Sequence, residues 1–223
     1  MLILGIDDAG RGPVIGPMVL AGCLVDEKTE KEFKRLGVKD SKQLTQKRRE
    51  FLDRIIKEKA ETFETVMVSA NEIDSMIKDG TNLNEIEAFL CGRIINKINK
   101  GFDKIKVVVD CPSTGIVKWQ DMLKTKIDNL SNLEISCEHK ADKNHIAVSA
   151  ASILAKTVRE KEVSKLKEIY GNDMGSGYAS DPITTKFLRK NIKKLDNSGL
   201  FRKSWATWKN AVAVGEQKKL RDF

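Results

Sequence analysis

Two adjacent carboxylates followed by a glycine-rich turn are the residues of this chain best suited to chemistry. Asp7 and Asp8 come at the end of an apolar run, and Gly10, Arg11 and Gly12 follow almost at once. Glycines expose backbone N–H groups and let a backbone approach a ligand closely. The planar guanidinium of an arginine matches the geometry of a phosphate. The pattern therefore predicts a metal ion held next to a phosphate.

Two further acids fall at the boundaries of predicted elements. Asp110 ends the β-branched run 105–109, and Asp142 lies between a short predicted strand and a long helix. The carboxyl ends of parallel strands share one edge of a sheet, so we expect these acids to converge with Asp7 and Asp8. Oxygen ligands without histidine or thiolate favour Mg²⁺, Mn²⁺ or Ca²⁺. Two such ions about 3.5–4 Å apart can activate a water and stabilise the leaving oxygen of a phosphoryl displacement.

Asp142 and three further candidate residues, Ser41, Lys42 and Tyr178, each have a structural interpretation beside the functional one. Capping of the following helix would by itself explain Asp142. The Ser41 hydroxyl and the Lys42 ammonium suit a phosphate, but they also fit a capped turn before the helix that starts near residue 45. Tyr178 sits in a glycine-rich loop, where an aromatic ring can stack on a base or sugar or simply pack against the protein.

Composition indicates a protein with a sizeable core and a polyanionic partner. The 223 residues carry a net charge of +8, with 40% hydrophobic and 32% charged residues. Residues 181–223 hold eleven Lys or Arg against four Asp or Glu, so nearly all the basic excess lies there. Nucleic acid would fit this charge, although a solvated helical surface is the common alternative. The four cysteines lack metal or disulfide spacing, and no signal peptide or membrane span is visible, which predicts a cytoplasmic protein without a membrane partner.

The periodicity of apolar residues predicts an α/β fold with a mixed sheet flanked by helices. We expect strands at residues 2–7, 14–25, 61–69, 105–110 and 133–137, antiparallel on one side of the sheet and parallel on the other. Helices are expected at residues 45–59, 83–98, 116–127, 148–169, 183–192 and 205–214. The predicted organisation is a catalytic domain at 1–180 and a basic helical region at 181–223.

Taken in order, several segments resemble one family, ribonuclease HII in its archaeal-like form. The matching segments are residues 5–13, Asp40-Ser41-Lys42, Asp110, residues 139–156 and residues 175–182. The resemblance implies a ribonuclease H-like fold with five strands and a helical C-terminal extension. It implies a monomeric, Mg²⁺- or Mn²⁺-dependent endoribonuclease of DNA replication and repair. Its substrates would be RNA–DNA hybrids and duplex DNA with embedded ribonucleotides, cut on the 5′ side to leave 5′-phosphate and 3′-hydroxyl ends.

The resemblance also implies roles for individual residues. Asp7, Asp8, Asp110 and Asp142 occupy the positions of the family's catalytic, metal-binding carboxylates. The segment Gly10-Arg11-Gly12 matches the one that contacts the 2′-hydroxyl and adjacent phosphate, and Tyr178 matches a tyrosine that stacks on the sugar. Ser41 and Lys42 match a segment beside the substrate backbone.

Two positions depart from the family pattern. Asp8 stands where the family usually has glutamate, and its side chain is one methylene shorter, on the order of 1 Å, in a site that tolerates about 0.5 Å. Metal binding should survive this change better than turnover. Ala179 replaces a proline that usually follows the tyrosine, so the loop should be less rigid.

The last seven residues carry a second motif. Gln217, Leu220 and Phe223 have the spacing of a clamp-interacting peptide, in which one helical turn directs two apolar side chains into one pocket. This resembles the tails by which replication and repair enzymes bind a sliding clamp, although a second aromatic residue is lacking. An ordinary basic helical tail is the alternative.

Two other functions fit the carboxylates. The same fold could serve a nuclease or integrase that acts on DNA alone, but such an enzyme would not need Gly10-Arg11-Gly12 together with Tyr178. A protein that binds hybrids and is disabled by Asp8 is the non-enzymatic alternative.

Overall fold

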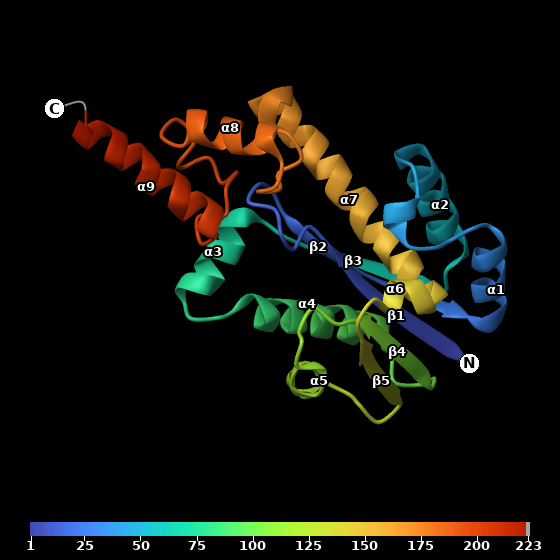
Figure 1. Ribbon diagram of the computed structural model, residues 1–223. Coiled ribbons are helices and arrows are strands. Elements are labelled where there is room, and N and C mark those ends of the chain that lie inside the picture. Colours follow the sequence, from blue (N-terminus) through green and yellow to red (C-terminus); the bar gives the residue numbers. More distant parts are fainter. Residues whose placement is uncertain (222–223) are drawn as a thin grey trace. The chain divides into compact units, whose positions relative to one another are not determined.

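The computed structural model describes the backbone of residues 1–221 and the side chains of residues 1–213 (Figure 1). By their packing the described residues form two compact units. The first unit comprises residues 1–9, 19–67 and 83–158, and the second comprises residues 10–18, 68–82 and those from 159 onward. The predicted boundary between residues 180 and 181 stays a prediction.

A mixed sheet of five strands forms the centre of the first unit, in the order β3-β2-β1-β4-β5. Strand β1 runs antiparallel to β2 and parallel to β4, which in turn is parallel to β5. This confirms the predicted division into an antiparallel and a parallel side. The strands are β1 (Leu2–Ala9), β2 (Met18–Asp26), β3 (Thr62–Val68), β4 (Ile105–Asp110) and β5 (Leu133–Glu138).

Helices cover both faces of this sheet. On one face, apolar side chains of α1 (Glu27–Arg35), α2 (Gln46–Lys59) and the first half of α7 (Ile146–Tyr170) share a core with β2 (Figure 1). On the other face, α4 (Leu83–Ile98) packs against β2, and α5 (Ile116–Lys124) packs against α4. The short helices η1 (Ser41–Gln43) and α6 (Ala141–Asn144) also belong to this unit.

Gly5 lets α7 lie directly on β1. A Cβ atom at this position would lie 2.1 Å from the carbonyl carbon of Ala147 and 2.2 Å from the backbone nitrogen of Val148. Backbone atoms cannot yield to such an overlap, so the close approach of α7 requires a glycine at position 5. The first turns of α7 are thereby fixed beside the strand that carries Asp7 and Asp8.

The second unit has its own apolar core. Helices α3 (Ala70–Lys78), α8 (Pro182–Asn191) and α9 (Ala206–Arg221), the short helix η2 (Asn172–Met174) and the second half of α7 belong to it. Its core is built by buried residues of the segment after β1 and of the C-terminal region: Val14, Ile15, Met174, Phe187, Leu188, Leu200, Phe201 and Trp208. Among the described residues, no helix is long and apolar enough to cross a membrane.

The structure corrects three sequence expectations. Strand β2 begins at Met18 rather than at residue 14, because Val14 and Ile15 are buried in the core of the second unit. Helices α1 and α3 were not predicted. Helix α1 buries only Phe33 on an otherwise charged surface, so its apolar signal is weak. Helix α3 begins with a capping box of Ser69 and Glu72, a signal that was present in the sequence.

Candidate active site

Asp7 and Asp8 lie near the end of β1, and the structure buries Asp7. The Asp7 side chain is 6% exposed and accepts a hydrogen bond from the Asp8 backbone N–H (2.7 Å) and another from Ser152 of α7. Burial raises the pKa of Asp7 well above its usual value, and the charges of Asp8 and Asp110 raise it further. Asp7 thus sits among like charges in a poorly solvated place.

Asp110 and Asp142 complete the group. Asp110 is the last residue of β4, and its carboxylate accepts a hydrogen bond from the backbone N–H of Ala141 (3.0 Å). This bond links the end of β4 to α6, which carries Asp142. Burial raises the pKa of both acids, and the charge of Asp110 adds to the rise at Asp142. We call Asp7, Asp8, Asp110 and Asp142 the carboxylate edge.

The structure therefore brings the four predicted acids to one end of the parallel strands. Within the described residues, however, no three His, Cys, Asp or Glu side chains are arranged so that they could hold a metal ion. The donors themselves are those that a hard divalent cation prefers, because they are carboxylate oxygens that repel one another. The chemistry of the donor set thus fits such an ion, and binding it would require the carboxylates to close around it.

Sequence reasoning missed Glu87. This side chain of α4 is 2% exposed and lines a small cavity together with Asp7, Asp8 and Asp110. The interpretation of residues 83–98 as an amphipathic helix considered only its apolar stripe. Glu87 follows Leu83 by one helical turn and therefore lies on the apolar stripe. A carboxylate among these apolar residues was the signal in the sequence that could have identified it.

Ser41 and Lys42 differ in their surroundings. The Ser41 side chain is buried, and its hydroxyl lies 2.9 Å from that of Ser152. The Asp40 carboxylate accepts a hydrogen bond from the Lys42 backbone N–H (2.9 Å). This is the capped turn that the sequence offered as the alternative to a phosphate site. The Lys42 side chain is exposed, and its charge lowers the pKa of Asp110 and Asp142, opposing the effect of burial.

The second unit carries Gly10, Arg11 and Gly12, which we call the recognition turn, together with Tyr178. A Cβ atom on Gly12 would lie 3.7 Å from the Tyr178 ring, so the ring lies against the turn. Tyr178 is 42% exposed, and the guanidinium carbon of Arg159 lies 5.6 Å from its ring centroid. The ring is thus supported by an arginine while part of it stays open to solvent.

The candidate clamp motif lies largely outside the described part of the chain. Phe223 is outside the described residues, and for Gln217 and Leu220 the structure describes only the backbone, which is helical in α9. The roles of these three residues stay predictions.

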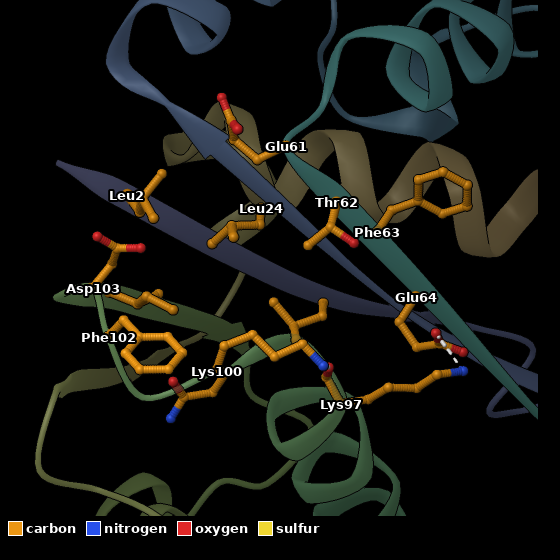
Figure 2. Close-up of a pocket in the computed structure, with 13 residues that line it drawn as sticks. Leu2, Leu24, Glu61, Thr62, Phe63, Glu64, Lys97, Lys100, Phe102 and Asp103 are labelled. Carbon is orange, nitrogen blue, oxygen red and sulfur yellow. Dashed lines mark hydrogen bonds and ion pairs between the residues drawn. The ribbon is translucent and has the colours of Figure 1, made fainter.

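A larger cavity lies where β1, β3 and β4 begin, away from the carboxylate edge. It measures about 480 Å³ and is lined by residues that include Leu2, Thr62 and Phe102 (Figure 2). Lys97 and Glu64, which form an ion pair (2.7 Å), both line this cavity. It contains none of the predicted site residues.

Comparison with known proteins decides the family. Residues 4–208 match the family model described as Ribonuclease HII. The chain belongs to the ribonuclease HII family. It is 42% identical to the ribonuclease HII of Methanocaldococcus jannaschii over 99% of both chains. The ribonuclease H2 structure from Pyrococcus horikoshii superposes with a TM-score of 0.84 at 35% identity, covering 95% of this chain and 97% of that one.

A further solved structure is the complex of PCNA with ribonuclease HII from Archaeoglobus fulgidus. It has a TM-score of 0.80 and 36% identity, and the match covers 92% of this chain and 95% of that one. These likenesses confirm the ribonuclease H-like fold. Membership of the ribonuclease HII family makes the chain an endoribonuclease that acts on RNA–DNA hybrids.

Burial of Asp7 beside the charges of Asp8 and Asp110 leads to a prediction for Asp7→Asn. Because folding raises the pKa of Asp7, it disfavours the ionised form, and stability is lost as pH rises from the usual carboxyl pKa through the raised one. The neutral amide should therefore stabilise the metal-free protein at pH 8 by about 1–3 kcal/mol. The difference should shrink toward pH 4, where the wild-type acid is protonated.

Thermal unfolding in EDTA at several pH values measures this effect. Asp128→Asn, at an exposed position, is the matched control and should change little. A lower melting temperature of Asp7→Asn at pH 8 would show that the cost of burying an ionised Asp7 among like charges does not dominate at this site.

Proposed function

We propose that the carboxylate edge binds divalent metal ions and that the protein cuts duplexes 5′ of ribonucleotides, leaving 5′-phosphate and 3′-hydroxyl ends. The observation that carries this proposal is the convergence of Asp7, Asp110 and Asp142, whose charges act on one another at one edge of the sheet. The recognition turn and Tyr178 would supply the preference for a ribonucleotide. The substrates would be RNA–DNA hybrids and duplex DNA with single ribonucleotides.

Each acid has a place in this mechanism. Asp7, Asp8, Asp110 and Asp142 would hold Mg²⁺ or Mn²⁺, two ions during catalysis. When bound, such ions make water a stronger nucleophile and stabilise the leaving oxygen of an in-line displacement. The chain's own contribution is to hold the carboxylates: the Ala141 N–H orients Asp110, and Ser152 and the Asp8 N–H orient Asp7. Lys42 brings a positive charge to the same place.

Recognition of the ribose would fall to the second unit. The backbone N–H groups of the recognition turn and the Arg11 side chain can bind a 2′-hydroxyl and a neighbouring phosphate. The exposed part of the Tyr178 ring can stack on the sugar next to the ribonucleotide. A nuclease that acts on DNA alone would gain nothing from this arrangement.

Tyr178 provides the test of this function. On a duplex with one ribonucleotide, wild type and Tyr178→Phe should cut 5′ of the ribonucleotide in Mg²⁺ and not in EDTA. Tyr178→Ala should cut this duplex at least about fivefold more slowly, since loss of stacking is worth about 1–3 kcal/mol. Its rate on a continuous RNA–DNA hybrid should fall less.

Product mapping and single-turnover rates on both duplexes measure these outcomes. Cutting of an all-DNA duplex at the same rate would contradict the proposed substrate. An unchanged ratio of the two rates in Tyr178→Ala would remove the stacking role while leaving the nuclease function intact.

The shorter acid at position 8 gives a second prediction. Asp8→Glu restores the side-chain length that the family pattern favours, and turnover should rise about tenfold in Mg²⁺ with a smaller gain in Mn²⁺. Asp128→Glu adds the same methylene at an exposed position and should leave the rate unchanged. If Asp8→Glu is no faster in either metal, the chain already places this carboxylate correctly.

We also propose a sliding clamp as a partner, bound through Gln217, Leu220 and Phe223. The ribonuclease HII of Archaeoglobus fulgidus was solved in complex with PCNA, and its fold matches this chain. Helix α9 continues through Gln217 and Leu220, consistent with a helical turn at the motif. The protein would work as a monomer in the cytoplasm, where its four free, buried cysteines would stay reduced.

Removal of residues 217–223 should abolish binding to an archaeal sliding clamp in a pull-down and spare cleavage of a free oligonucleotide. The double variant Leu220→Ala, Phe223→Ala should behave in the same way, because both apolar side chains fill one pocket in this binding mode. Replacing Lys218 and Lys219, which lie off the motif, is the control. Clamp binding that persists after the deletion would refute the motif.

A further inference from the structure

Arg202 is a fully buried arginine, and each of its three guanidinium nitrogens donates to a backbone oxygen of one short segment. It is 0% exposed. Its Nη2 donates to the Gly10 carbonyl (2.7 Å), its Nη1 to the Arg11 carbonyl (2.9 Å) and its Nε to the Gly16 carbonyl (3.0 Å). A charged side chain that is withdrawn from water must be satisfied in this way, and its fixed fork sets the orientation of its acceptors.

Trp205 extends this set of bonds by one residue. Its Nε1–H donates to the Gly12 carbonyl (3.1 Å), and its ring lies 4.9 Å from the guanidinium carbon of Arg202. All three carbonyls of the recognition turn are therefore held from one side.

The direction of the carbonyls fixes the direction of the N–H groups. The peptide bonds of the turn are trans. The C=O of one residue and the N–H of the next therefore lie in one plane and point in opposite directions. Holding the Gly10 and Arg11 carbonyls toward Arg202 turns the N–H groups of Arg11 and Gly12 the other way. Gly10 itself has a φ of +88°, and a Cβ there would lie 2.2 Å from Nε of Arg159, so the turn is also confined on a second side.

Arg202 is itself held by its neighbours. Its backbone N–H donates to the Val14 carbonyl (2.9 Å), and Ile15 pairs with Phe201 in an isolated β-bridge. The Asp74 carboxylate of α3 accepts hydrogen bonds from the backbone N–H groups of Lys203 (2.6 Å) and Ser204 (2.9 Å). The segment that carries Arg202 and Trp205 is thus fastened to α3 on one side and to the turn on the other.

We propose that Arg202, assisted by Trp205, is a positioning residue for ribonucleotide recognition. By holding the carbonyls of the recognition turn, it aims the N–H groups of Arg11 and Gly12 at the 2′-hydroxyl and the adjacent phosphate. This rests on the proposed function, in which the recognition turn meets the ribonucleotide. Arg202 would never touch the substrate. It supplies a fixed geometry, which the backbone N–H groups need because, unlike a side chain, they cannot reorient by a change of rotamer.

The test measures recognition apart from chemistry. Binding to a duplex with one ribonucleotide and to the same duplex made of DNA is compared by fluorescence anisotropy in EDTA, where no cutting occurs. Arg202→Lys keeps the charge, but one ammonium cannot span three carbonyls. The preference for the ribonucleotide should fall about tenfold, the effect of losing one or two charge-assisted hydrogen bonds. Arg35→Lys, at an exposed position of α1, should keep the full preference.

Trp205→Phe is the second variant, since Arg202→Lys can fail to fold. It removes only the donor to Gly12, and the preference should fall about threefold, less than in Arg202→Lys because a neutral hydrogen bond is worth less. Circular dichroism and the melting temperature establish that the compared variants are folded. A folded variant of either residue that keeps the full preference overturns the positioning role.

Failure of the proposed function gives a different result. If the wild-type protein binds both duplexes equally, the recognition turn does not sense the ribonucleotide, and both proposals fall. If the wild type discriminates and folded Arg202→Lys or Trp205→Phe discriminates equally well, only the role of Arg202 falls.

Discussion

The burial of carboxylates that the fold holds together, with the repulsion between them, is the constraint on which the first unit depends. Asp7, Asp110 and Asp142 are each poorly solvated, and each has its pKa raised by burial. Ionised acids in such surroundings destabilise a fold unless a cation balances them. The sheet, α6 and α7 therefore maintain an arrangement that is unfavourable in the free protein, and the divalent ions that we propose would offset its cost.

The fold tolerates this arrangement because its surroundings are rigid. At Gly5 the backbone of α7 meets β1 with no room for a Cβ atom, which fixes Ser152 relative to Asp7. The bond from the Ala141 N–H to Asp110 fixes α6 relative to β4. In the second unit, buried hydrogen bonds likewise fix a turn. The buried Arg202 guanidinium donates to the carbonyls of Gly10, Arg11 and Gly16. In both places buried polar contacts fix the geometry of groups that would otherwise be free to move.

Elements with a regular local pattern could be predicted from the sequence. The strand that ends in Asp110 and the helix at Leu83–Ile98 appear as expected, because their β-branched and apolar residues recur at regular spacing. The identity of the four acids came from their place at element ends and from the family resemblance. Helix α1 was missed because a charged helix with one buried residue has little apolar periodicity.

Other features could not be predicted because they depend on contacts between distant residues. Glu87 lines the same cavity as Asp7 only because α4 packs beside β1 and β4. Arg202 and Gly10 lie 192 positions apart in the sequence, and no local sequence pattern predicts their hydrogen bond. The contact between the hydroxyls of Ser41 and Ser152 likewise joins residues that lie 111 positions apart.

Our proposal assigns metal chemistry to the carboxylate edge and ribonucleotide recognition to the recognition turn and Tyr178, as separate tasks of separate residues. Equilibrium binding of Asp142→Asn in Mg²⁺, to a duplex with one ribonucleotide and to the same duplex made of DNA, tests this division most directly. We expect that the variant no longer cuts the duplex with the ribonucleotide but still binds it in preference to the duplex made of DNA. A variant that cuts as fast as the wild type, or that binds both duplexes equally when the wild type does not, would show that the division is wrong.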